Sequence, residues 1–91
     1  MKIKNIESGS FIAEVDGEKA GHVDYIYKEG NIIVLDGTDV YPDYREHGIG
    51  EKLVMEVVEL ARKKNMKIET VCSFASTIFS DKEEELSDVI A

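Results

Sequence analysis

The sequence predicts a small α/β domain of the α+β type, in which a mostly antiparallel mixed sheet carries one long helix and short C-terminal helices. Two observations lead to this fold class. Apolar and polar residues alternate in several early segments that end in turn residues, which is typical of antiparallel strands. A long amphipathic helix then lies between two strand-like segments, and this order implies a right-handed crossover with parallel pairing.

The first 30 residues predict an antiparallel meander. Residues 2–6 alternate Lys or Asn with Ile, as expected for a short edge strand in which lysine opposes pairing with other chains. Residues 11–15 predict a second strand, and Asp16-Gly17 after it is the strongest hairpin signal in the chain. A return strand is expected over residues 19–27. The remaining turns are expected at Glu7-Ser8-Gly9-Ser10 and at Lys28-Glu29-Gly30.

The segment from Asn31 to Tyr41 predicts the next strand. It begins with Ile32-Ile33-Val34-Leu35, which is apolar on both faces and therefore predicts a central strand covered on both sides. Asp36-Gly37 interrupts it, either as a tight turn into another strand or as a bulge within one long strand. We favour the bulge, because only four residues separate Gly37 from Pro42.

The main helix is expected from Gly48 to Lys64, and Asn65 is a suitable C-terminal stop. Residues 67–71 predict a short strand after it. The apolar residues of the helix recur at intervals of three and four and describe one buried stripe: Ile49, Leu53, Val57, Leu60 and Ala61.

Two short elements are expected after the last strand. Residues 74–79 predict about one and a half helical turns that pack Phe74, Ile78 and Phe79 on the sheet. The acidic segment from Asp81 to Ile90 predicts a frayed helix with solvated carboxylates.

The composition excludes several classes of protein. A chain of 91 residues is expected to form one domain (1–91), as a monomer or homodimer. A net charge of −8 argues against a nucleic-acid partner, which needs a basic surface. No apolar run approaches a membrane span and the first residues do not resemble a signal peptide, so a cytoplasmic protein is expected, and the single cysteine excludes an internal disulfide. No metal site is expected.

The most informative stretch is Arg45-Glu46-His47-Gly48-Ile49-Gly50, which stands between a strand and the main helix. Its glycines serve either to bind a phosphate group with the free N–H donors of the first helical turn or only to pack the helix on the strand. It contains neither a P-loop nor a dinucleotide-binding motif. The run fits R-x-x-G-x-G and resembles the pyrophosphate-binding motif of the GNAT superfamily of acetyl-CoA-dependent N-acetyltransferases. Val40, Pro42, Leu53 and Val54 agree with that family's strand, turn and helix, and the resemblance extends over residues 10–79.

The resemblance is best to very short GNAT-like proteins with Cys-Ser-Phe after the parallel strand, here Cys72-Ser73-Phe74. It implies a minimal GNAT-like fold that binds acetyl-CoA, with the pantetheine between the strands that end at Tyr41 and Cys72. It implies N-acetyl transfer to a protein or small amine acceptor. Glu46 departs from the family pattern, which often has Gly there. The residues implied to bind the cofactor are Val40, whose N–H would polarise the thioester carbonyl, and Arg45, Glu46, His47, Gly48, Ile49 and Gly50.

Cys72 is either a small buried apolar residue or a thiol that accepts or guides the acyl group. His47 is either a phosphate or adenine contact or a solvated side chain, and His22 is expected to be structural. The general base is left open among Glu14, Asp24, Tyr25, Asp39 and Tyr41. The family's usual helices between the first two strands, and its final hairpin, have no room here. The function therefore remains open between an N-acetyltransferase, a non-catalytic acyl-CoA-binding or sensing module that acts through a protein partner, and a scaffold without a ligand.

Overall fold

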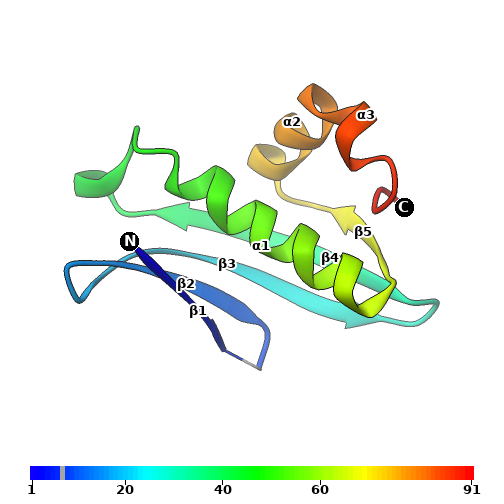
Figure 1. Ribbon diagram of the computed structural model, residues 1–91, viewed down its shortest axis with the longest axis horizontal. Helices are drawn as coiled ribbons and strands as arrows, with labels where there is room; N and C mark the ends of the chain where they lie inside the picture. Colours follow the sequence, from blue (N-terminus) through cyan, green and yellow to red (C-terminus); the bar gives the residue numbers. More distant parts are fainter. Residues whose placement is uncertain (7) are drawn as a thin grey trace.

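The computed structural model describes residues 1–6 and 8–91 and contains a five-stranded mixed sheet with three α-helices (Figure 1). The order of the strands in the sheet follows their order in the chain, β1-β2-β3-β4-β5. The predicted fold class is therefore confirmed. The elements are β1 Lys2–Ile6, β2 Ser10–Val15, β3 Glu18–Lys28, β4 Ile32–Val40, the 3-10 helix η1 Pro42–Tyr44, α1 Ile49–Lys64, β5 Lys67–Thr70, α2 Ser73–Asp81 and α3 Glu83–Leu86.

The first four strands form the predicted meander, with each strand antiparallel to the next. The turn between β2 and β3 places Asp16 at φ 51° and Gly17 at φ 82°, the positive values that a two-residue hairpin turn requires. Of the turn predicted over residues 7–10, Glu7 lies outside the described residues. The N–H of Gly9 donates to the carbonyl of Ile6 at 2.9 Å across this turn.

The predicted bulge in β4 is confirmed. Tyr25 on β3 faces Leu35, whereas the preceding residue Asp24 faces Gly37, so Asp36 is the extra residue. Because the side-chain period of a strand is two, one extra residue exchanges the two faces of the strand beyond it. As a result Leu35 and Thr38 both direct their side chains toward the helices.

The predicted helix and parallel strand are also confirmed. Gly48, at φ 73°, is the N-terminal cap of α1, and Asn65, at φ 57°, is its C-terminal cap, whose N–H donates to the last turn. The strand β5 then pairs in parallel with β4 and ends where Thr70 faces Leu35. Buried residues of α1 are Ile49, Gly50, Leu53, Val54, Val57, Val58 and Ala61.

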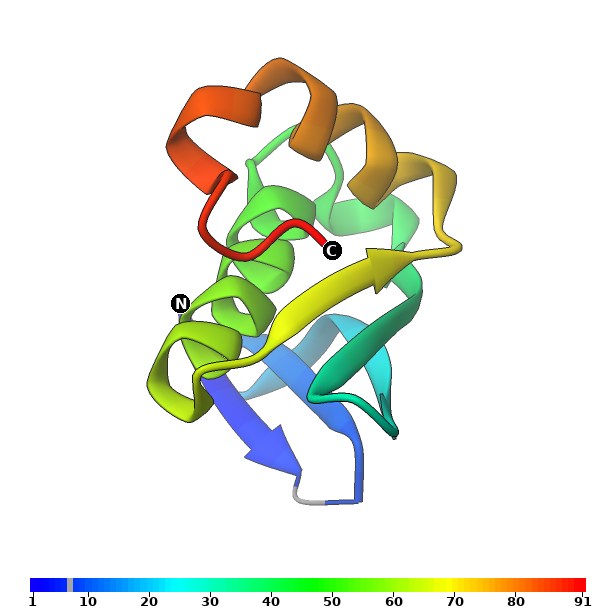
Figure 2. The ribbon, with the colours of Figure 1, turned by 90° about the vertical axis from the view of Figure 1, so that its right-hand side faces the viewer.

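The helices contribute to one core on one face of the sheet (Figure 2). The side chains of Ile33 and Leu35 are fully buried there, whereas Ile32 and Val34, which point the other way, are half-buried. The prediction that β4 is covered on both sides is therefore wrong. The strand is central because β3 and β5 flank it, but no described helix covers its second face.

The C-terminal region differs from the prediction in two respects. Phe74 borders the end of β4 but does not join the core: it is 46% exposed and lies against Gly50 at the start of α1. The tail is packed rather than frayed, because Leu86 and Val89 are almost fully buried. Its end forms a parallel bridge in which Ile90 pairs with Ile68 of β5. Within residues 1–6 and 8–91, no helix has the length and apolar character needed to span a membrane.

We predict that Gly21→Ala destabilises the protein by about 1–3 kcal/mol, because a Cβ there would lie 2.5 Å from the backbone carbonyl oxygen of Asp39. The matched control is Gly37→Ala on the adjacent strand, where a Cβ meets no atom within 4 Å, and we expect a change within about 0.5 kcal/mol. Urea unfolding measures both free energies. Equal effects of the two substitutions would contradict the close approach of β3 and β4 at Gly21.

Candidate active site

The loop from Arg45 to Gly50 begins directly after η1 and leads into α1. The guanidinium of Arg45 donates from Nε to the carbonyl oxygen of Val40 at 3.0 Å, which ties the loop to the end of β4. Glu46 has φ 68° and Gly48 has φ 73°. Positive φ costs a residue with a Cβ more than it costs glycine, so Glu46 holds a conformation that suits glycine better.

The N–H groups of residues 46–51 form the central feature of this loop. In the described part of the chain, none of them donates to a backbone or side-chain acceptor, whereas the N–H of Lys52 bonds to the carbonyl of Gly48 at 3.1 Å. The donors of the first helical turn point along the helix axis, and the dipole of the 16-residue helix α1 adds positive potential at the same place. The loop therefore offers main-chain donors to an anion.

A cleft opens beside the loop because β4 extends beyond the end of β5. The N–H of Tyr41 bonds to the carbonyl of Ala20 on β3 at 2.9 Å. Hydrogen-bonded and non-bonded pairs alternate in an antiparallel ladder, so the N–H groups of Thr38 and Val40 point away from β3. They point into the space that β5 leaves when it ends at Thr70.

Two adjoining cavities occupy this cleft, with volumes of about 290 Å³ and 230 Å³. The first lies along β4 and is lined by Thr38 and Asp39, and the second lies at the loop and is lined by Gly48 and Gly50. Val40, Arg45 and Phe74 line both. The cleft is thus continuous from the free N–H groups of the loop to Thr38.

Cys72 is the N-terminal cap of α2 and adjoins the cleft through Thr38, without lining either cavity. Its Sγ is 3.6 Å from the hydroxyl of Thr38, 34 residues earlier in the chain. Partial burial alone would raise the pKa of the thiol. The backbone N–H of Ala75, the hydroxyl of Thr38, and the backbone N–H groups of Phe74 and Thr38 lower it, and together they hold the pKa of Cys72 below its ordinary value. These donors favour the thiolate, which is the nucleophilic form.

The structure places the other predicted site residues as follows. His47 is exposed in the loop, and Ile49 turns its side chain into the core, so only its N–H faces the loop. Two of the candidate bases lie away from the cleft. Glu14 forms an ion pair with Lys4 at 3.3 Å, and the buried Tyr25 accepts a hydrogen bond from Asn5.

Two residues that line the cleft were not identified from the sequence. Thr38 reaches Cys72 only because the bulge in β4 turns its side chain toward the helices. Phe74 was predicted to be a core residue, but its ring covers Gly50, where a Cβ would lie 2.7 Å from the ring. The alternation of residues after a bulge could have identified Thr38, whereas no local signal indicates the direction of Phe74.

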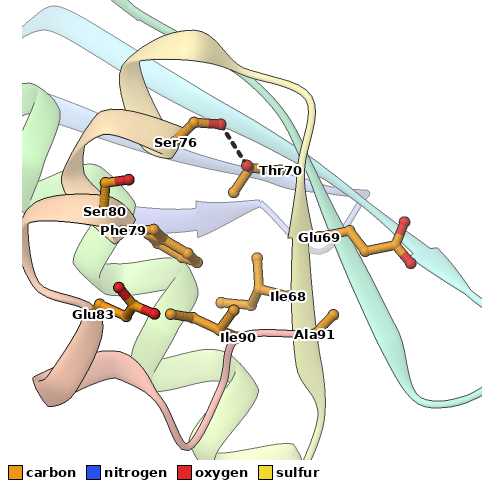
Figure 3. A pocket seen from close by; sticks show the side chains of 9 residues that line it. All are labelled: Ile68, Glu69, Thr70, Ser76, Phe79, Ser80, Glu83, Ile90 and Ala91. Carbon is orange, nitrogen blue, oxygen red and sulfur yellow. Dashed lines mark hydrogen bonds between the residues drawn. The ribbon is translucent and has the colours of Figure 1, made fainter.

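A separate hollow of about 460 Å³ lies on the other side of α2, between β5 and the end of the chain (Figure 3). Ile68, Phe79 and Ile90 form its apolar wall, and the hydroxyls of Thr70 and Ser76 are bonded to each other at 2.6 Å (Figure 3). It shares no lining residue with the cleft. We therefore place the candidate active site in the cleft between the loop and Thr38, with Cys72 beside it.

Comparisons with known proteins agree with this geometry. The chain is similar over 99% of its length to a GCN5-like protein from Staphylococcus aureus, with 33% identity, a TM-score of 0.76 and 87% of that protein covered. An aminoglycoside N-acetyltransferase solved in complex with CoA matches 85% of the chain at 27% identity, with a TM-score of 0.59 and 64% of its own chain covered. None of the curated proteins compared with the chain matches it.

More distant structures show the same fold. An N-acetylglutamate synthase from Neisseria gonorrhoeae, solved with coenzyme A and N-acetyl-glutamate, matches 82% of the chain at 21% identity, with a TM-score of 0.69. The chain spans only 18% of that protein. The model of one protein family, described as GCN5-related N-acetyl-transferase, matches residues 10–89. A match of this extent, on a chain that folds with the cleft described above, shows that the protein belongs to the GCN5-related N-acetyltransferase family.

Proposed function

We propose that residues 1–91 form one acetyl-CoA-binding domain that transfers the acetyl group to an amine. The observation that carries this proposal is the row of unpartnered N–H groups over residues 46–51, at one end of a cleft that reaches Thr38, the residue in contact with Cys72. The CoA bound in the aminoglycoside N-acetyltransferase named above supports it.

The residues of the loop fit the diphosphate of CoA. Main-chain donors at a helix N-terminus bind phosphate oxygens without a net positive surface, which suits a chain with a net charge of −8. Arg45 adds a cation and also braces the loop through its bond to Val40. Phe74 lines both cavities and supplies an apolar wall for the pantetheine chain.

The inner end of the cleft would hold the reacting group. Acetyl-CoA supplies an acetyl group that is activated as a thioester. The N–H of Val40, which has no partner on β3, would donate to the carbonyl oxygen of that thioester and stabilise the charge that develops on it. The amine either attacks the acetyl carbon directly or receives the group from Cys72.

In the route through Cys72, the thiolate forms a new C–S bond to the acetyl carbon while the C–S bond to CoA breaks. The released CoA sulfur takes a proton from solvent. The amine then forms a C–N bond to the same carbon, the bond to Cys72 breaks, and the amine proton is lost to the departing sulfur or to solvent. The donors from Thr38, Phe74 and Ala75 stabilise Cys72 as both nucleophile and leaving group.

A non-catalytic acyl-CoA-binding module is the second candidate. The observation that favours it is the direct antiparallel pairing of β1 with β2, which leaves no helices to wall an acceptor site. Both candidates bind acetyl-CoA, so turnover separates them. Release of CoA on addition of amines supports the transferase, and binding without release supports the module.

We predict that CoA shifts the amide resonances of residues 46–51 in ¹⁵N-labelled protein, because their N–H groups receive the diphosphate. Pantetheine, which lacks the diphosphate, should shift only amides along the cleft such as those of Thr38 and Val40. Arg45→Gln should weaken CoA binding by roughly tenfold, the effect of one charge-assisted hydrogen bond. Lys63→Gln, of equal charge change at the far end of α1, is the control. Equal loop shifts with both ligands would refute diphosphate binding there.

We predict that Glu46→Gly strengthens CoA binding by roughly threefold to tenfold. The substitution removes a carboxylate beside the diphosphate and places glycine at a φ of 68°, which glycine adopts without strain. Isothermal titration measures the affinity, and thermal unfolding should show that the variant is no less stable. Weaker binding by Glu46→Gly would mean that the carboxylate itself contributes a contact.

We predict that incubation with acetyl-CoA adds one acetyl group to the protein at Cys72, as measured by intact-mass spectrometry, and that Cys72→Ala abolishes the gain. Because the pKa of Cys72 is lowered, its alkylation by iodoacetamide should reach half its maximal rate at a lower pH than that of an ordinary cysteine. Thr38→Val removes one donor, raises the pKa, and should slow alkylation at neutral pH by roughly threefold. Identical spectra for the native and Cys72→Ala chains would exclude the cysteine route.

A further inference from the structure

The face of the sheet that no described helix covers carries a group of polar side chains beside the cleft. Ser10 on β2 faces Asp24 on β3, and His22 on β3 faces Asp39 on β4. Asp24 also faces Gly37, the residue after the bulge. Residues two apart on one strand lie on the same face of a sheet, and so do residues directly opposite each other on neighbouring strands. All five residues therefore lie on one face.

The ring of His22 is held in one orientation. Its Nδ1 lies 3.3 Å from Oδ1 of Asp24, and the same oxygen accepts the hydroxyl hydrogen of Ser10 at 2.8 Å. An ionised carboxylate only accepts hydrogen bonds, so Asp24 favours the tautomer that carries its hydrogen on Nδ1. The Nε2 of the neutral ring then keeps a free lone pair, and the side chain is 28% exposed. His22 can therefore accept a proton at Nε2.

The charged groups near His22 on this face are the carboxylates of Asp24, Asp39 and Glu14 and the ammonium groups of Lys4 and Lys19. Lys19 faces Glu14 and lies over the ring of Tyr41, 5.8 Å from its centroid. On β2 the residue opposite His22 is Ile12, and on β4 it is Asp39. Glu14, on the same face, is paired with Lys4. Among the described residues, neither Asp24 nor Asp39 has a lysine or arginine within ion-pair distance. These two carboxylates can attract an external cation.

This group of residues reaches the cleft through Asp39 alone. Asp39 lines the cavity along β4, between Thr38 and Val40, whose N–H groups point toward the thioester position. Gly37 beside it has no side chain, and a Cβ there would meet no atom within 4 Å.

We infer that Ser10, His22, Asp24, Gly37 and Asp39 form an amine site, which binds the ammonium group of a primary amine acceptor and removes its proton. The inference rests on the proposed function. Asp39 and Asp24 bind the ammonium, His22 is the catalytic base, and Ser10 and Asp24 position its ring. In this assignment His22 is not only structural, and CoA and acceptor approach the cleft from opposite faces of the sheet.

The transfer of protons and bonds is as follows. An ammonium has no lone pair, so Nε2 of His22 first takes one N–H proton, directly or through a water, and becomes an imidazolium beside Asp24. The amine lone pair then forms the C–N bond to the acetyl carbon on Cys72, and the C–S bond breaks. The second amine proton passes to the departing sulfur, and His22 releases its proton to solvent. In the direct route the sulfur of CoA takes the place of Cys72.

The experiment measures amine-dependent discharge of the acetyl group with two nucleophiles. Native and variant chains are incubated with acetyl-CoA and then with n-butylamine, which is cationic at neutral pH, or with hydroxylamine, which is mostly neutral. Loss of acetyl-Cys72 is followed by intact mass, and CoA release is followed with a thiol reagent. Urea unfolding of each variant shows that the fold is retained.

We predict that Asp39→Asn slows discharge to n-butylamine by about tenfold and leaves discharge to hydroxylamine within about twofold, because only the first nucleophile is cationic. His22→Gln should slow discharge to n-butylamine by about 100-fold at neutral pH. The difference in rate from the native chain should shrink as the pH rises, because the free amine then forms without a base. The matched control is Glu69→Gln on the same face, whose carboxylate is already paired with Lys28 at 3.2 Å.

The outcomes distinguish a failure of the proposed function from a failure of the amine site. If the native chain neither binds CoA nor acetylates Cys72, the proposed function fails. If it binds CoA and releases it with n-butylamine, but Asp39→Asn, His22→Gln and Glu69→Gln behave alike, the amine site is refuted. The amine site would also be refuted if Asp39→Asn slowed discharge to n-butylamine and to hydroxylamine equally, because equal slowing would show a general disturbance of the cleft.

Discussion

The separation of β4 from β5 is the constraint on which the site depends. β4 and β5 pair with each other only as far as Leu35 on β4 and Thr70 on β5. The extra residue Asp36 then turns the remainder of β4, so that its main-chain donors face open space rather than a neighbouring strand. Without that interruption the strands would continue side by side, and neither the cavities nor the contact between Thr38 and Cys72 would form.

The sequence was sufficient for features that local geometry determines. The hairpin at Asp16-Gly17 and the loop at Gly48 follow from positive φ angles, and α1 follows from the spacing of its apolar residues. The bulge at Asp36-Gly37 could be chosen over a turn because few residues remained before Pro42. Such features depend on neighbours in the chain, so no knowledge of the packing was needed.

Features that depend on distant contacts were missed or predicted wrongly. An apolar run such as Ile32–Leu35 indicates a central strand, but whether its second face is covered depends on where the helices lie. Phe74 is apolar enough for the core, yet Gly50, 24 positions earlier, leaves the space that its ring occupies. The contact between Cys72 and Thr38 likewise joins residues 34 positions apart.

The last residues of the chain have a consequence for its behaviour in concentrated solution. The main chain of Ile68 donates to Val89 at 2.6 Å and accepts from Ala91 at 3.0 Å, so the outer border of β5 is already occupied at its middle. The guanidinium of Arg62 anchors this segment through Asp88 at 2.9 Å. At the opposite border, β1 presents Lys2 and Lys4 to solvent. Neither border is therefore a good template for a foreign strand, and the molecule resists the edge-to-edge assembly that leads to fibrils.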